Sequence, residues 1–180
     1  MKTVEAELVE NRVVVWDIED SRDLYSEGFF GKPLGVAKPK GRDFDSPLIL
    51  DLVEALYLLG KGRIRVKRGR GTAGQRELAR RCAAEYAGFK EKFAVYRHLR
   101  DLGYVVTPGI KFGCDFAVYR HGPGIDHAPF LIQVMRPGDQ VTATQMVLSG
   151  RLATTVRKQF LIASAGPGTP EYLSFDWWKA

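Results

Sequence analysis

The sequence predicts an α/β protein of the α+β kind, with a small N-terminal α/β domain followed by a domain built on a mixed sheet. Three observations support this fold class. Short apolar runs with strand periodicity alternate with longer segments in which apolar residues recur at helical spacing. A length of 180 residues, 45% of them hydrophobic, allows one medium domain or two small ones with proper cores. The Gly-rich stretch 69–71 marks a boundary, which places the domains at 1–70 and 71–180.

The N-terminal part opens with two expected strands, Val4–Val9 and Arg12–Ile18, joined by a tight two-residue turn. Asp20 is then expected to cap a short helix that stops near Gly28. Both expectations rest on local signals, because the strands follow from the apolar pattern and the helix from its capping residue.

A loop rich in Gly, Pro and cations follows at residues 31–42. Its composition is typical of a solvated connection, although loops of this kind also display functional side chains. Beyond it, Ser46 as N-cap and Pro47 at the first helical position predict a helix that ends at Gly60.

Residues 61–70 carry six cations among ten positions. Ile64 and Val66 alternate with these cations, which predicts a half-buried strand with a basic outer face. Two interpretations stay open. The segment is either a solvated edge strand protected from aggregation or a track for a phosphate backbone.

The second half begins with Thr72 and Gln75, which resemble a capping box. The helix that they start is expected to loosen at Gly88 and to resume through Leu99, with His98 as a structural or surface residue. The remaining expected elements are strands over 104–107, 111–119, 130–135, 159–164 and 171–176 and a helix over about 141–156. Together they predict a mixed sheet with helices packed on it.

The chain has 27 Lys and Arg residues against 21 Asp and Glu, which gives a net charge of +6. An excess of positive charge favours a polyanionic partner, although many basic proteins bind no nucleic acid. No apolar run approaches the ~20 residues needed to span a bilayer, and the N-terminal stretch has no signal-peptide pattern. We therefore expect a cytoplasmic protein without a membrane partner.

Cys82 and Cys114 are the only cysteines. Neither belongs to a CxxC or Cys/His ligand pattern, so we expect no metal site and no cofactor. Two isolated thiols suit a reducing cytosol. A disulfide between them stays open at this point.

Metal-free RNA cleavage needs a base for the 2′-OH, an acid for the leaving 5′-oxygen and a cation for the developing charge. The stretch 104–160 offers one of each: Tyr119 at a strand end, His127 in the following loop and Lys158 after the helix. Ordinary structural explanations also exist, such as an amphipathic strand-end tyrosine or a lysine placed for the helix dipole. His121 competes with His127, and spacing alone does not choose between them.

A tyrosine acts as a base only where cations lower its free pKa of about 10. Lys158 and Arg120 are the candidates for this effect. Arg151 precedes Lys158 by seven residues, or two helical turns, so the two share a face if the helix persists.

A metal-dependent nuclease is the first rival hypothesis, and it needs clustered carboxylates with a lysine close by. Asp115 is present, but the next strand reads Gln133–Met135 where a second acid and a lysine are expected. The second rival is a non-catalytic subunit that binds RNA without cutting it.

Three motifs occur in order along the second half: Gly109-x-Lys-Phe-Gly-x-Asp-Phe-x-Val-Tyr119, His127-Ala-x-Phe-Leu and Arg151-Leu-Ala-x-x-Val-Arg-Lys158. With them, roughly residues 72–180 resemble the catalytic domain of archaeal tRNA-splicing endonucleases. Leu24-Tyr25 with 28–32 is similar, more weakly, to the N-terminal domain of that family. The resemblance implies a restriction-endonuclease-like fold for the second domain.

The resemblance also implies a catalytic triad, with Tyr119 as base, His127 as acid and Lys158 as charge stabiliser. His127 is preferred over His121 because His-Ala-x-Phe-Leu opens the next strand, as the family histidine does. The implied substrate is precursor tRNA folded as a bulge-helix-bulge at the exon–intron junctions. The implied products carry a 2′,3′-cyclic phosphate and a 5′-hydroxyl.

Family members pinch a bulge base between flat side chains, and Arg151 matches the family arginine by position. Trp177 and Trp178 are candidates for the second jaw, since an indole can stack on a base or an arginine. The loop at 31–42 resembles an insertion in which a lysine touches RNA, and Lys38 and Lys40 are the candidates there.

The loop over 164–170 has no acidic residue before Glu171. Self-assembling members of the family carry acids in this loop that insert into a basic pocket on a partner. The difference implies an α2β2 heterotetramer with a separate, non-catalytic paralogue instead of a homotetramer. Self-association through the C-terminal strand is expected to join two sheets by main-chain hydrogen bonds.

Overall fold

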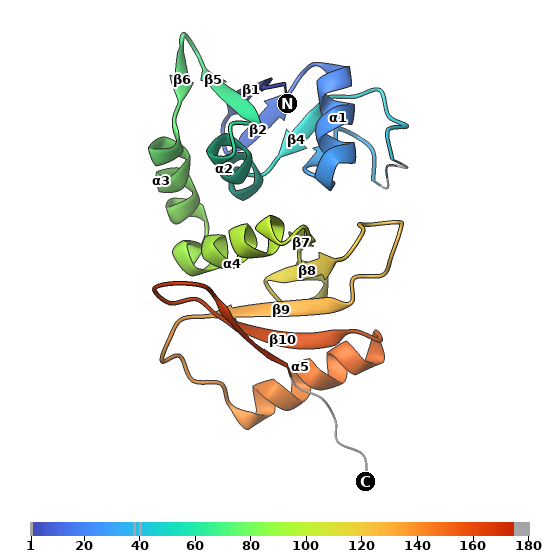
Figure 1. Ribbon diagram of the computed structural model, residues 1–180, viewed down its shortest axis with the longest axis vertical. Coiled ribbons are helices and arrows are strands. Elements are labelled where there is room, and N and C mark those ends of the chain that lie inside the picture. Colours follow the sequence, from blue (N-terminus) through green and yellow to red (C-terminus); the bar gives the residue numbers. More distant parts are fainter. Residues whose placement is uncertain (1, 38, 40, 175–180) are drawn as a thin grey trace. The chain divides into compact units, whose positions relative to one another are not determined.

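The computed structural model describes residues 2–37, 39 and 41–174 and divides the chain into two compact units, Met1–Ala87 and Gly88–Ala180 (Figure 1). The boundary between the two units thus lies between residues 87 and 88, later in the chain than the boundary expected near residue 70. The reason is that strand β6 (Gly71–Ala73) pairs with β5 (Ile64–Arg68), while helix α3 (Gln75–Glu85) packs on α2 (Leu52–Gly60). The mixed α/β class is confirmed.

The first unit contains a six-stranded sheet in the order β3-β4-β2-β1-β5-β6. The expected hairpin is present as β1 (Val4–Val9) and β2 (Arg12–Val15), which pair antiparallel. Strand β1 also pairs with β5 in parallel, so the sheet is mixed. The two remaining strands are short: β3 (Lys32–Pro33) and β4 (Leu48–Leu50).

Helix α1 (Ile18–Gly28) begins one turn earlier than the sequence suggested. Asp17 is its N-cap, and the Asp17 side chain accepts a hydrogen bond from the Asp20 backbone N–H. Asp20 was expected to be the cap, and this expectation was wrong. Asp20 is instead a buried carboxylate that forms an ion pair with the Lys2 Nζ at 2.6 Å.

Ser46 and Pro47 do not start a helix, which corrects the expectation made from the sequence. The next residues form strand β4, which pairs with β2 and β3 and buries Leu48 and Leu50 completely. Helix α2 begins after Asp51, whose side chain forms a capping box with Glu54. Sheet pairing and burial outweigh the local Ser-Pro signal, because alternating leucines fill the core only in a strand.

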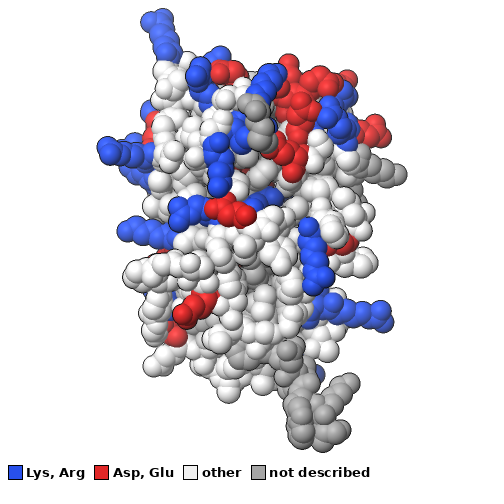
Figure 2. Space-filling model, in the orientation of Figure 1, with Lys and Arg blue, Asp and Glu red and all other residues white. Residues whose placement is uncertain are grey.

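Strand β5 has the expected half-buried pattern, with Ile64 and Val66 in the core. It lies between β1 and β6 and is therefore not the edge of the sheet. On the exposed face of the strand, the Glu5 carboxylate lies 3.0 Å from the Lys67 Nζ and 3.9 Å from the Arg65 Nη1. Basic and acidic side chains are also intermixed on the face of this unit that Figure 2 shows. Pairing with Glu5 thus favours a solvated strand over a phosphate track.

The second unit is a five-stranded mixed sheet in the order β11-β10-β9-β8-β7. Strands β9 and β10 are parallel, and the other neighbours are antiparallel. Helix α4 contacts β7 and β9, whereas α5 contacts β10 (Figure 1). The elements are α4 (Phe89–Asp101), β7 (Val105–Pro108), β8 (Phe116–Tyr119), β9 (Phe130–Met135), α5 (Ala143–Thr155), β10 (Gln159–Ser164) and β11 (Glu171–Ser174).

Two local expectations for this half of the chain need correction. Thr72 lies in β6, and helix α3 starts after Gly74 without a side-chain cap, so no Thr72–Gln75 capping box forms. The strand expected over 111–119 is shorter, because a 3-10 turn at Ile110–Phe112 precedes β8. The helix break at Gly88 is confirmed, since this residue has a φ of +67°. Among the described residues, no helix is long and apolar enough to cross a membrane.

Candidate active site

One rim of the second sheet carries the ends of three neighbouring strands. Val118 of β8 pairs with Phe130 of β9, and Phe130 pairs with Gln159 of β10. Tyr119 therefore stands one residue beyond this row, and Lys158 one residue before it. The chain from His127 to Pro129 leads directly into the row. Strand register thus brings the three predicted catalytic positions to the same rim.

Tyr119 is half-buried at the end of β8. It packs against a core cluster beneath α5 that includes Ala128, Ala153 and Phe160. This packing holds the aromatic ring against the α5 side of the sheet while leaving part of the side chain accessible.

The loop between Tyr119 and His127 is closed by the Asp126 carboxylate. Its two oxygens accept hydrogen bonds from three successive backbone N–H groups, of Arg120, His121 and Gly122, at 2.9–3.2 Å. His121 and His127 are both exposed. Only His127 follows the clamped Asp126 directly and leads into β9. No pattern in the sequence had singled out Asp126.

Lys158 follows α5 and is half-buried. Its Nζ donates a hydrogen bond of 2.7 Å to the carbonyl of Ala128, the residue after His127, and lies 5.4 Å from the centroid of the Phe112 ring. Burial lowers the pKa of Lys158, attraction to Asp126 raises it, and repulsion from Lys111 lowers it, with a net lowering. The amine is therefore directed at the rim by a carbonyl on the His127 segment.

Arg151 lies exposed on α5. The helix ends at Thr155, and Arg157 takes a left-handed conformation with a φ of +54°. Arg151 and Lys158 therefore do not share a helical face, because the helix ends and the chain turns between them. Lys38, Lys40, Trp177 and Trp178 lie outside the residues that the structure describes.

Asp115 belongs to an ion-pair network away from the rim. Its carboxylate is 2.8 Å from the Lys92 Nζ and accepts hydrogen bonds from the Gln133 side chain and the Val134 backbone N–H. Within the described ranges, no group of three or more His, Cys, Asp or Glu residues is arranged to hold a metal. Asp115 thus links α4 to β9, which is a structural role.

Several other groups singled out from the sequence have structural surroundings. The ring of His98 stacks on Tyr172, and its Nδ1 lies 2.9 Å from the Tyr172 hydroxyl. Cys82 in the first unit and Cys114 in the second are both free, buried thiols. Burial raises the pKa of Cys82 to about 12 and that of Cys114 to about 11.

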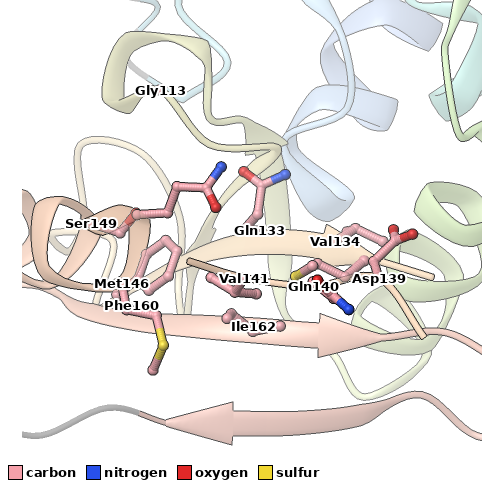
Figure 3. A pocket seen from close by; sticks show the side chains of 12 residues that line it. Gly113, Gln133, Val134, Asp139, Gln140, Val141, Met146, Ser149, Phe160 and Ile162 are labelled. Atoms are coloured by element: carbon pink, nitrogen blue, oxygen red, sulfur yellow. The ribbon is translucent and has the colours of Figure 1, made fainter. Parts of the chain in front are cut away.

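A cavity of about 420 Å³ lies between α5, β9 and β10 (Figure 3). It is lined by the second half of β9, from Gln133 to Met135, whereas His127 precedes the start of that strand. Polar side chains such as Gln140 and apolar ones such as Phe160 surround it. Its lining residues do not include Tyr119, His127 or Lys158.

The chain is thus an α/β protein of two units, in which a phenol, an imidazole and an amine lie at one rim of the second sheet. Two family models match the chain. The tRNA intron endonuclease N-terminal domain matches residues 4–79, and the tRNA intron endonuclease catalytic C-terminal domain matches residues 89–169. The chain belongs to the tRNA intron endonuclease family and is an endonuclease.

Relatives support this assignment over nearly the whole length. A tRNA-splicing endonuclease of Hyperthermus butylicus is 46% identical, with 98% of this chain and 99% of the relative covered. One from Pyrobaculum aerophilum is 44% identical, with 92% and 93% covered. One from Sulfurisphaera tokodaii is 36% identical, with 96% and 98% covered. The predicted family and enzyme class are confirmed.

Proposed function

We propose that this protein cleaves precursor tRNA at bulge-helix-bulge exon–intron junctions by transesterification, without a metal, using Tyr119, His127 and Lys158. The observation that carries the proposal is the rim itself, where strand register and the Lys158–Ala128 hydrogen bond gather these positions. The two family matches support tRNA as the substrate class.

The reaction assigns one task to each group. Tyr119 removes the proton from the 2′-OH, and the resulting oxygen attacks the adjacent phosphorus. As the new P–O2′ bond forms, the P–O5′ bond breaks, and His127 gives a proton to the leaving 5′-oxygen. Lys158 stabilises the extra negative charge on the phosphorane. The products carry a 2′,3′-cyclic phosphate and a 5′-hydroxyl.

Recognition is expected to depend on RNA shape and on splayed bulge bases, since the deep major groove of an RNA duplex hides its bases. Arg151, exposed on α5, is our candidate for one jaw of a clamp on a bulge base. The proposed second jaw is Trp177 or Trp178. The proposed further RNA contact is Lys38 or Lys40.

The proposed assembly is an α2β2 heterotetramer with a non-catalytic paralogue. The loop 165–170 contains no acidic residue with which to enter a basic pocket on another copy. Strand β11 is the outermost strand of the described sheet, which leaves one side for pairing with a second copy. We place the enzyme in the cytoplasm, where free thiols such as Cys82 and Cys114 persist.

The test compares His127→Ala with His121→Ala on a bulge-helix-bulge RNA, with and without the paralogue. His127→Ala should lower the single-turnover rate by about 10²–10⁴-fold, because the leaving oxygen loses its proton donor. RNA binding should persist. His121→Ala is the matched control from the same loop and should cleave normally.

Normal cleavage by His127→Ala would refute its role as the acid. The same assay in excess EDTA addresses a metal-dependent mechanism, since loss of activity there would reject the proposed chemistry. Tight binding without cleavage by the wild type, even after addition of the paralogue, would identify a non-catalytic subunit instead.

A further inference from the structure

The loop over 120–126 connects two of the three proposed catalytic residues, and one carboxylate holds it together. The Asp126 Oδ2 accepts from the backbone N–H of Arg120 at 3.0 Å and of His121 at 3.2 Å, while Oδ1 accepts from Gly122 at 2.9 Å. The backbone N–H groups of Ile125 and Asp126 both donate to the Gly122 carbonyl. Hydrogen bonds therefore join the first three residues of the loop to its last two.

The position of this clamp along the chain is what relates it to catalysis. Its first donor, Arg120, is the neighbour of Tyr119, and Asp126 is the neighbour of His127. On the other side of His127, the Ala128 carbonyl accepts from the Lys158 Nζ at 2.7 Å. His127 is thus flanked by two anchored residues, although its own ring is exposed.

Asp126 also brings charge to the rim. Burial alone would raise its pKa, but the three backbone donors and the nearby His121 outweigh this, so the pKa is lowered and the carboxylate stays ionised. Asp126 is two residues from Ala128, whose carbonyl accepts the hydrogen bond from the Lys158 Nζ. Burial lowers the pKa of Lys158, the Asp126 charge raises it and Lys111 lowers it.

We propose that Asp126 is a positioning residue of the cleavage reaction, which clamps the loop between Tyr119 and His127 and supplies a fixed negative charge to Lys158. This inference rests on the proposed function of the triad. It assigns to Asp126 two separable effects, one on loop geometry and one on the charge of the Lys158 amine.

Two substitutions separate these effects. Asp126→Asn keeps the side-chain size but removes the charge and replaces one acceptor oxygen by a donor. Asp126→Glu keeps the charge but lengthens the side chain. Asp139→Asn is the matched control, because Asp139 also accepts a backbone N–H, from Arg136, and its pKa is also lowered by this contact.

The measurement is the single-turnover cleavage rate of a bulge-helix-bulge RNA as a function of pH, with the full chain and its paralogue. Asp126→Asn should cleave roughly 10–100-fold more slowly, since small misplacements of catalytic groups have effects of this size. Its RNA affinity should change less than about threefold. The alkaline limb of its pH–rate profile should move to lower pH, because Lys158 loses the charge that favours its protonated form.

Asp126→Glu should cleave slowly as well but keep the alkaline limb of the wild type, and Asp139→Asn should match the wild type in both respects. The inference would be overturned if Asp126→Asn kept both the wild-type rate and the wild-type alkaline limb. It would also be overturned if the alkaline limb moved by the same amount in Asp126→Asn and Asp126→Glu. If Asp126→Asn fails to fold, the Glu variant decides, because a wild-type rate there excludes the clamp. A wild type that cleaves no bulged RNA would overturn the proposed function itself.

Discussion

Lys158 illustrates how a single side chain is tuned by its surroundings. Its side chain is half-buried, its amine donates to the Ala128 carbonyl, and the charges of Asp126 and Lys111 act on it. Burial is the largest of these influences and lowers the pKa of Lys158 below its ordinary value. The protonated amine that the proposed mechanism requires is therefore lost at a lower pH than for an exposed lysine.

This leads to a prediction for the pH dependence of cleavage. As pH rises through the lowered pKa of Lys158, the phosphorane loses its cation and the rate should fall. In Lys158→Arg the guanidinium stays protonated in this range, so its alkaline limb should lie at higher pH, even if the absolute rate is lower. The measurement is a pH–rate profile of single-turnover cleavage, corrected for uncatalysed RNA hydrolysis. Identical alkaline limbs in both proteins would contradict the prediction.

At the scale of elements, the start of α2 shows why a strong local signal can mislead. Ser46 and Pro47 are typical of a helix start, yet Leu48 and Leu50 are fully buried in β4. The Ser46 hydroxyl is buried without a hydrogen-bond partner, whereas Asp51 forms the capping box of the helix. The side chain of Asp51, and not that of Ser46, should therefore stabilise the start of α2.

The corresponding prediction compares two alanine variants. Asp51→Ala should lower the free energy of unfolding by about 1 kcal/mol, within a usual range of about 0.5–2 kcal/mol for a lost N-cap. Ser46→Ala should change it little, because no hydrogen bond is lost. Equilibrium denaturation in urea measures both. A larger loss in Ser46→Ala than in Asp51→Ala would be incompatible with the observed helix start.

At the scale of the whole molecule, β11 is the outermost strand of the second sheet among the described residues. It pairs with β10 on one side, and Leu173 on it is 60% exposed. Edge strands of this kind are templates for pairing with another chain unless charges block them. This supports the proposed self-association through the C-terminal strand.

A lysine placed on this edge should disrupt that association. We expect Leu173→Lys to lower the mass of the assembly in light scattering after size exclusion, because the introduced charge would have to be buried or repelled. Leu102→Lys is the control, since Leu102 is equally exposed but follows α4. An unchanged mass for Leu173→Lys, or an equal effect of both variants, would argue against pairing through β11.

The sequence by itself determined the protein class, most of the elements and the family. Short apolar runs identified β1, β9 and β10, and helical spacing with Gly88 identified the α3–α4 break. Three spaced motifs identified the family. These features were accessible because each depends on residues close together in the chain.

Only the tertiary structure decided what depends on distant residues. β4 became a strand because β2 and β3 flank it. Asp17 caps α1, while the Asp20 carboxylate pairs with Lys2 from another part of the chain. The rim at Tyr119, the Asp126 clamp and the Lys158–Ala128 contact likewise arise from register and loop closure. Local patterns do not encode such contacts, since their free energy exists only once the sheet brings the partners together.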